Sequence, residues 1–188
     1  MKFQTISVVL SGLVDILFDR FIDHSSERRP PEQKLYLGSD NLVVLPGNNI
    51  TSFLFGNQSG CAKAFEGKKA KDYLRIGQSH VFLNSPMIPF LDEAGQELRF
   101  DKFGDKFWIL TESAVTRKGA LCIKQEAKDR PVIKRPWQLA FEMCLIENPI
   151  ISENKLYNWL VMGGMQIGLG SYRPRFGRFE VKEWSIKE

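Results

Sequence analysis

Residues 167–184 read IGLGSYRPRFGRFEVKEW, and this stretch governs how the rest of the chain is interpreted. Glycine lets the backbone adopt positive φ angles and approach other groups closely. Arginine presents a planar set of donors that suits phosphate. Since the stretch follows a predicted helix and leads into a predicted last strand, it predicts a basic loop pressed against the end of a sheet. A tight turn with solvated arginines has the same composition and stays open as the alternative.

The composition is that of a globular protein rather than a disordered chain. The 188 residues are 43% hydrophobic and 26% charged, which suits one domain with a sizeable core. The net charge of +4 permits an anionic partner without requiring one. The three cysteines are widely spaced and form no C-x-x-C pair, so neither a disulfide framework nor a zinc site is expected. Free thiols indicate a reducing compartment, and no metal or other cofactor is predicted.

The first 18 residues, MKFQTISVVLSGLVDILF, are apolar but interrupted by polar side chains. They lack a basic start and a small-residue cleavage site, so a signal peptide is not expected. The sequence contains no run of 18 apolar residues, so no membrane-spanning helix is expected either.

Apolar patterning predicts strands and helices in alternation along the chain. Residues 3–13 are expected to form a central strand buried on both faces, and 14–22 a short helix or a second extended piece. A small hairpin is expected at 35–45, then a helix from about Ile50, capped by Asn48 or Asn49, and a second helical stretch at 60–74. The remaining predicted elements are one bent strand from runs 80–83 and 88–91, strands at 107–111 and 138–146, a helix after Ser152, and a last strand from Phe179.

The second unusual segment is residues 111–137, which reads as a hairpin with a turn at Lys118-Gly119. It carries seven cationic side chains against three anionic ones, which makes a local basic surface. Such a hairpin can reach along a nucleic-acid backbone and would add a salt-dependent contribution to affinity. A lysine-rich face is also predicted over residues 63–75, where simple solvation is the favoured interpretation.

With this hairpin treated as an insertion, the order of elements fits β-α-β-β-α-β. The predicted fold class is therefore α+β, a ferredoxin-like or RRM-like antiparallel sheet in a single domain over residues 1–188. The last strand would lie either directly beside the first strand or separated from it by one strand. The glycine-rich loop would then sit at one end of the sheet, between the second helix and the last strand.

The helix ending in Gly163-Gly164, followed by the loop and strand IGLGSYRPRFGRFEV, resembles the C-terminal glycine-rich signature of the RAMP superfamily. These are RRM-fold subunits of CRISPR ribonucleoprotein complexes, among them backbone subunits that polymerise along guide RNA. The Leu-Pro-Gly-Asn-Asn-Ile stretch at 45–50 and the hairpin at 111–126 fit the same pattern, and the ending GLGxxRPRFGRF also resembles that of small phage-encoded proteins. The resemblance implies a cytoplasmic protein of a bacterial or phage-infected cell.

The leading functional prediction is a non-catalytic protein that binds RNA or single-stranded DNA. Assembly as a homo-oligomer along the strand is an option that the sequence leaves open. Single-strand binders combine a positive groove with aromatic faces on which bases stack. Loop glycines add close approach of backbone N–H groups to phosphates. The predicted binding residues are Arg117, Lys118, Lys124, Arg130, Lys134, Arg135, Gly168, Gly170, Tyr172, Arg173, Arg175, Phe176 and Arg178.

Two alternatives stay open on the sequence. One is a metal-independent endoribonuclease of the RAMP type, for which His24 and His80 are the catalytic candidates, although neither lies in a recognisable constellation with a second base. The other is a protein-interaction or phage structural component whose basic loop contacts an acidic partner. Trp137 precedes an apolar strand and is expected in the core rather than as a stacking face.

Overall fold

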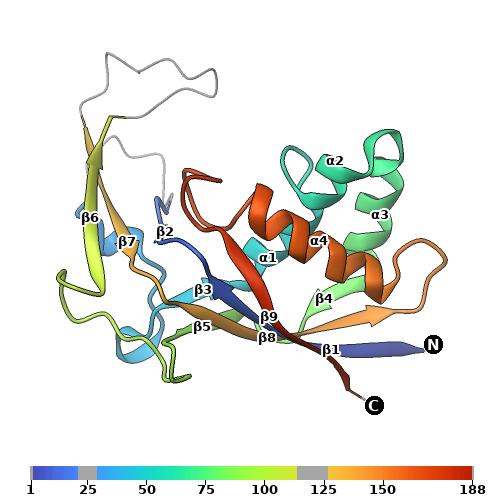
Figure 1. Ribbon diagram of the computed structural model, residues 1–188, viewed down its shortest axis with the longest axis horizontal. Helices are drawn as coiled ribbons and strands as arrows, with labels where there is room; N and C mark the ends of the chain where they lie inside the picture. Colours follow the sequence, from blue (N-terminus) through green and yellow to red (C-terminus); the bar gives the residue numbers. More distant parts are fainter. Residues whose placement is uncertain (1, 21–28, 114–126, 188) are drawn as a thin grey trace.

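The computed structural model describes residues 2–20, 29–113 and 127–187 and has an α+β architecture (Figure 1). A central antiparallel sheet carries helices on one face, and a smaller sheet stands at one end of it. The strands of the central sheet are β1 (Phe3–Gly12), β3 (Val44–Pro46), β4 (Val81–Leu83), β5 (Met87–Leu91), β8 (Gln138–Ile146) and β9 (Phe179–Lys187). The helices are α1 (Gly47–Phe55), α2 (Cys61–Phe65), α3 (Ala70–His80) and α4 (Glu153–Gln166). The smaller sheet consists of β2 (Ile16–Leu17), β6 (Phe107–Glu112) and β7 (Lys128–Ile133).

The central sheet has the strand order β3-β5-β8-β1-β9, and β4 also pairs with β8. The last strand therefore lies directly beside the first, in one of the two predicted positions. The first strand is central, as predicted, but it is buried on one face only. Ile6, Val8 and Leu10 are fully buried, whereas Ser7 and Val9 on the opposite face are half-buried. This one-sided burial follows from the alternation of side chains along a strand.

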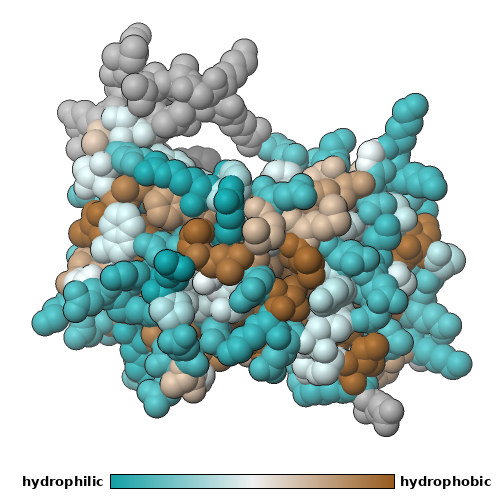
Figure 2. Space-filling view, viewed as in Figure 1, coloured by the Kyte–Doolittle hydropathy of each residue, from teal (hydrophilic) through white to brown (hydrophobic). Residues whose placement is uncertain are grey.

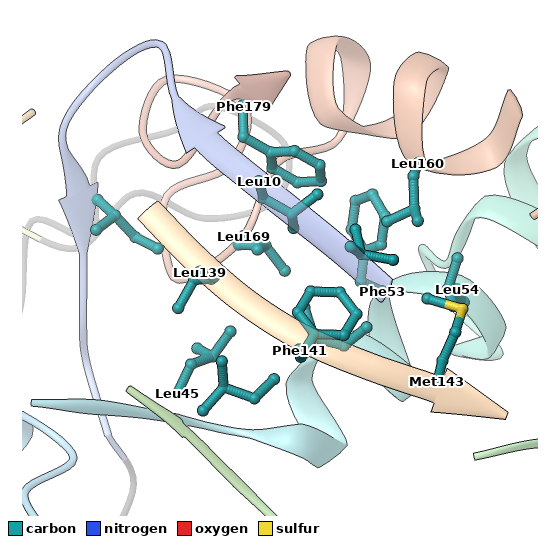
Figure 3. Packing of buried hydrophobic residues seen from close by; sticks show 14 of the residues in the cluster. Leu10, Leu45, Phe53, Leu54, Leu139, Phe141, Met143, Leu160, Leu169 and Phe179 are labelled. Atoms are coloured by element: carbon teal, nitrogen blue, oxygen red, sulfur yellow. The ribbon is translucent and has the colours of Figure 1, made fainter. Parts of the chain in front are cut away.

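The main core fills the space between this sheet face and the helices. Figure 3 shows Leu10 of β1 and Leu139 and Phe141 of β8 facing Phe53 of α1 and Phe179 at the start of β9. The rings of Phe53 and Phe179 lie 5.3 Å apart between centroids. Trp137 is fully buried, as predicted. On the outer surface, hydrophilic residues dominate, and hydrophobic ones gather where α4 and β9 lie (Figure 2).

Several predicted boundaries are wrong, for local reasons. α1 starts at Gly47, earlier than predicted, and its N-cap residue Pro46 has no side-chain acceptor to cap the helix. The predicted caps Asn48 and Asn49 lie inside the first turn, where the Asn49 amide donates to the Pro46 carbonyl. The second helical stretch is divided near Gly67, which has a φ of +54°. His80 ends α3 rather than belonging to a strand.

The predicted bent strand is two strands, β4 and β5, which both pair with β8. Ser152 caps α4 as predicted, since its hydroxyl accepts from the Lys155 backbone N–H at 3.2 Å. α4 itself continues past the Gly163-Gly164 pair to Gln166.

The predicted hairpin is part of the smaller sheet. Its arms β6 and β7 pair from Phe107↔Ile133 to Glu112↔Lys128, so the first arm starts earlier than the predicted residue 111. The predicted turn at Lys118-Gly119 lies outside the described residues. β2, the extended alternative predicted for residues 14–22, pairs with β7. This sheet has a small core of its own, made of Leu17, Val132 and Phe176. Within the described residues, no helix is long and apolar enough to cross a membrane.

Candidate nucleic-acid interface

The segment 167–178, here called the arginine loop, joins α4 to β9 and is held by backbone hydrogen bonds at both ends. The Leu169 N–H donates to the Gly177 carbonyl at 2.9 Å, and the Gly177 N–H donates to the Asp15 carbonyl at 2.8 Å. The Ser171 N–H donates to the Leu17 carbonyl at 2.8 Å. Gly177 has a φ of +75°, and a Cβ there would overlap the Leu169 carbonyl oxygen. The loop is therefore pinned to the segment that links β1 to β2, which only a glycine at 177 permits.

The two aromatic residues of the arginine loop face inward. The Phe176 side chain is buried with Leu17 and Val132 and has no free face on which a base could stack, so the predicted binding role of Phe176 is wrong. Tyr172 is half-buried, with a φ of +54°, and its ring lies under the Arg130 guanidinium at 4.7 Å.

Arg130 is also an internal residue, since its side chain is only 2% exposed. Its Nε donates to the Asp19 carboxylate at 2.9 Å, and its NH1 donates to the Glu112 and Lys128 carbonyls. These contacts and the burial of the side chain withdraw Arg130 from the surface, so the predicted phosphate contact at Arg130 is wrong. Arg130 instead positions Tyr172 and the ends of β6 and β7.

The three arginines of the loop are exposed and differ in their contacts. Arg173 donates to the Ser59 hydroxyl at 3.3 Å and to the Gly168 carbonyl at 3.5 Å. Packing around its guanidinium lowers the pKa of Arg173, which still carries its charge at neutral pH. Arg175 forms an ion pair with Glu112, which raises the pKa of Arg175. The Arg178 guanidinium has no hydrogen-bond or ion-pair partner among the described residues.

Lys134 and Arg135 lie in the turn between β7 and β8 and are exposed. Asp15 connects this turn to the arginine loop. One of its carboxylate oxygens accepts from the Arg135 backbone N–H at 3.0 Å, the other accepts from the Trp108 indole N–H at 3.0 Å, and its carbonyl binds the Gly177 N–H. The turn and the loop are thus attached to opposite sides of one residue, although they are far apart in the sequence.

The Asp15 contacts hold together, at one end of the central sheet, the backbones of two segments that carry five exposed cationic residues. We call this set the basic rim; it consists of Lys134, Arg135, Arg173, Arg175 and Arg178. The open face of the sheet carries charges of both signs, because the strand register places Glu142 beside Ser7, Glu183 beside Val9 and Lys187 beside Thr5, and Lys187 pairs with Glu142. The five cationic residues of the basic rim lie in the arginine loop and the β7–β8 turn rather than on this face.

The predicted glycines Gly168 and Gly170 lie in the loop with φ angles of +75° and +77°. A Cβ on Gly170 would meet the Leu17 carbonyl, so Gly170 serves the close packing of the loop against β2, whereas a Cβ on the buried Gly168 would meet the Gly177 carbonyl, so Gly168 serves packing within the loop. Arg117, Lys118, Lys124 and His24, also named from the sequence, lie outside the described residues.

His80, at the end of α3, lies far from the arginine loop (Figure 1). Its Nδ1 is 2.7 Å from the Ser79 hydroxyl and 3.2 Å from the Ile76 carbonyl. In the ranges that the structure describes, no group of three or more His, Cys, Asp or Glu side chains could hold a metal ion.

Sequence reasoning missed the acidic residues that organise this end of the molecule, namely Asp15, Asp19 and Glu112. Asp15 and Asp19 appear only as polar interruptions of an apolar run, and Glu112 as one of three anions opposing a basic segment. No local pattern could reveal their roles, since Asp15 binds a backbone group 120 positions away and Glu112 an arginine 63 positions away.

Comparison with known proteins yields a structural likeness and no sequence match. No protein-family model matches the chain, and no curated protein matches it. Among solved structures, the chain is similar to one in the cryo-EM structure of the Type III-B Cmr-beta bound to cognate target RNA, with a TM-score of 0.54 and 11% sequence identity. The alignment covers 100% of this chain and 61% of that chain, so this chain spans about three fifths of its neighbour's length. At this identity the likeness shows a shared fold.

Proposed function

We propose that this protein binds single-stranded RNA through the basic rim. The observation that carries the proposal is the meeting of two basic segments, distant in the sequence, at one end of a sheet. Cationic side chains that line one edge can follow a phosphate backbone without reading bases. The RNA-bound state of the Cmr-beta neighbour supports RNA as the ligand.

The proposal includes an RRM-like, ferredoxin-type arrangement of the RAMP kind. In its support, β9 lies beside β1, β1 lies beside β8, and β8 pairs with β4 and β5, with helices following β3 and preceding β9. In this arrangement the β6–β7 hairpin is an addition to a single domain. Fold alone does not establish function, so the rim residues carry the functional argument.

The deciding experiment is a salt titration of binding to a fluorescein-labelled single-stranded RNA of mixed sequence, read by fluorescence anisotropy from 50 to 200 mM salt. Replacing Arg173, Arg175 and Arg178 together with alanine should weaken binding to every sequence. It should also reduce the slope of log affinity against log salt by about 2, since each single-strand phosphate contact contributes roughly 0.7.

The matched control replaces Lys63, Lys68 and Lys71 with alanine, which removes the same charge from exposed positions around α2 and α3. This control should bind RNA nearly as well as the wild type. Absence of binding by the wild type at about 50 mM salt, where phosphate contacts are strong, would refute the proposal. If both triple variants weaken RNA binding equally, the binding depends on the net charge of the protein and not on the basic rim. Competition with single-stranded DNA of the same sequence tests the preference for RNA.

The proposal assigns the protein no chemistry of its own. Labelled RNA incubated with the protein should stay intact, and His80→Ala should bind as the wild type does. Cleavage that disappears in His80→Ala or His24→Ala would instead identify a ribonuclease. Light scattering with and without RNA tests assembly along the strand.

A further inference from the structure

The Arg175–Glu112 ion pair lies where the arginine loop meets the end of β6. Arg175 NH1 donates to Glu112 Oε2 at 2.8 Å, and NH2 donates to Oε1 at 2.9 Å. In this side-by-side geometry a guanidinium can bind a carboxylate or a phosphate group equally well. The Glu112 carboxylate therefore occupies the end-on pair of donors, one on each terminal nitrogen, with which Arg175 could also bind a phosphodiester.

The pair is exposed enough to open readily. The Arg175 side chain is 62% exposed and the Glu112 side chain 33% exposed, and ion pairs in such surroundings contribute little to stability. The neighbouring Arg130–Asp19 pair differs, because the Arg130 side chain is only 2% exposed and donates to further groups. A ligand can therefore displace Glu112 from Arg175 but cannot displace Asp19 from Arg130 at similar cost.

Both partners keep their backbone positions without the pair. The Glu112 carbonyl accepts from Arg130 NH1 at 3.0 Å, and Glu112 pairs with Lys128 in the small sheet. Arg175 precedes the buried Phe176, which holds that part of the loop. Opening the pair thus requires rotation of two side chains and no movement of the fold.

From these contacts we infer that Glu112 is an intramolecular competitor for the Arg175 donors, which a phosphodiester group of the bound RNA displaces. This inference rests on the proposed function and names Glu112 as a residue that sets the affinity of the protein for RNA. With Glu112 in place, the guanidinium is held in one orientation at the rim, and a phosphate that binds its end-on donors must replace the carboxylate there. Removing the Glu112 charge should therefore tighten binding, although Glu112 touches no ligand.

The test measures RNA binding by four forms of the full chain at 100 mM salt: wild type, Glu112→Gln, Arg175→Ala and the double variant. Glu112→Gln should bind about twofold to fivefold tighter than the wild type, as expected for an exposed pair of this kind. The double variant should bind as weakly as Arg175→Ala, because the competitor acts only through Arg175. Glu183→Gln is the control, since it removes one negative charge from an exposed position on the open sheet face.

Unfolding in urea checks that each variant is folded at the assay temperature. Unchanged or weaker binding by Glu112→Gln overturns the inference, and so does an equal gain in Glu183→Gln or a gain that persists without Arg175. In these three outcomes the wild type still binds RNA, so the proposed function stands. If neither the wild type nor Glu112→Gln binds RNA, both the proposed function and the inference fail.

Discussion

The Arg130 guanidinium lies on the ring of Tyr172, 4.7 Å from the ring centroid, and joins the small sheet to the arginine loop. The same guanidinium pairs with Asp19 at 2.9 Å. Arg130→Ala should therefore lower the free energy of unfolding by about 3 kcal/mol, because it removes the buried hydrogen bonds to Asp19 and to the Glu112 and Lys128 carbonyls and leaves Asp19 with Lys34, at 3.8 Å, as its ion-pair partner. Urea unfolding measures this loss. The exposed Arg135→Ala should change the free energy by no more than about 0.5 kcal/mol, and equal losses would contradict the structural role of Arg130.

Gly177 should tolerate no side chain. Its φ of +75° is unfavourable for other residues, and a Cβ would overlap the Leu169 carbonyl. We expect Gly177→Ala to cost about 2 kcal/mol or more and to weaken RNA binding, because the loop must move away from Asp15. Gly104→Ala is the control, since nothing lies within 4 Å of a Cβ at Gly104, and its stability should stay near that of the wild type. Thermal unfolding compares the two.

Asp15→Asn should loosen the attachment of the basic rim. The carboxylate accepts from two N–H groups, those of Trp108 and Arg135, whereas an amide offers one oxygen and turns a donor toward the second group. The expected loss of stability is about 1–3 kcal/mol, and RNA binding should weaken with it. Asp101→Asn, at an exposed position, should change neither. Wild-type stability and affinity in Asp15→Asn would show that the carboxylate does not organise this end of the sheet.

Cys61 should make the protein less stable in alkali. Its thiol is fully buried and donates to the Trp159 carbonyl at 3.4 Å, and burial raises the pKa of Cys61. The folded state therefore keeps its proton where the unfolded state, with an ordinary pKa of about 8.5, loses it. The contribution of the protonated thiol to the free energy of unfolding is complete below pH 8 and declines as the pH rises. At pH 10 the free energy of unfolding should be lower by about 2 kcal/mol.

Urea unfolding under reducing conditions at pH 7 and pH 10 measures this decline. Cys61→Ser is the matched variant, because its hydroxyl does not ionise in this range. At pH 7 the Cys61→Ser variant should have a lower free energy of unfolding than the wild type. Between pH 7 and pH 10 its free energy of unfolding should fall by about 2 kcal/mol less than that of the wild type. Equal losses in both proteins would contradict the prediction.

The sequence by itself determined the elements whose signals are local. The run of apolar and β-branched residues from Phe3 predicted the strand β1, the run 138–146 predicted β8 with its observed bounds, and Ser152 marked the start of α4. Charge and glycine content also pointed to the arginine loop and to exposed Arg173, Arg175 and Arg178. These features follow from side-chain periodicity and backbone freedom, which neighbouring residues are enough to specify.

Only the tertiary structure decided which charges are available to a ligand. Arg130 and Arg175 looked alike in the sequence, yet one is buried on Asp19 and Tyr172 and the other lies exposed against Glu112. Burial and pairing depend on residues that approach from more than 60 positions away, and no local pattern encodes that approach. For the same reason, the sequence does not show that the two segments of the basic rim meet. Their meeting depends on the contacts of Asp15 with the arginine loop and with the β7–β8 turn.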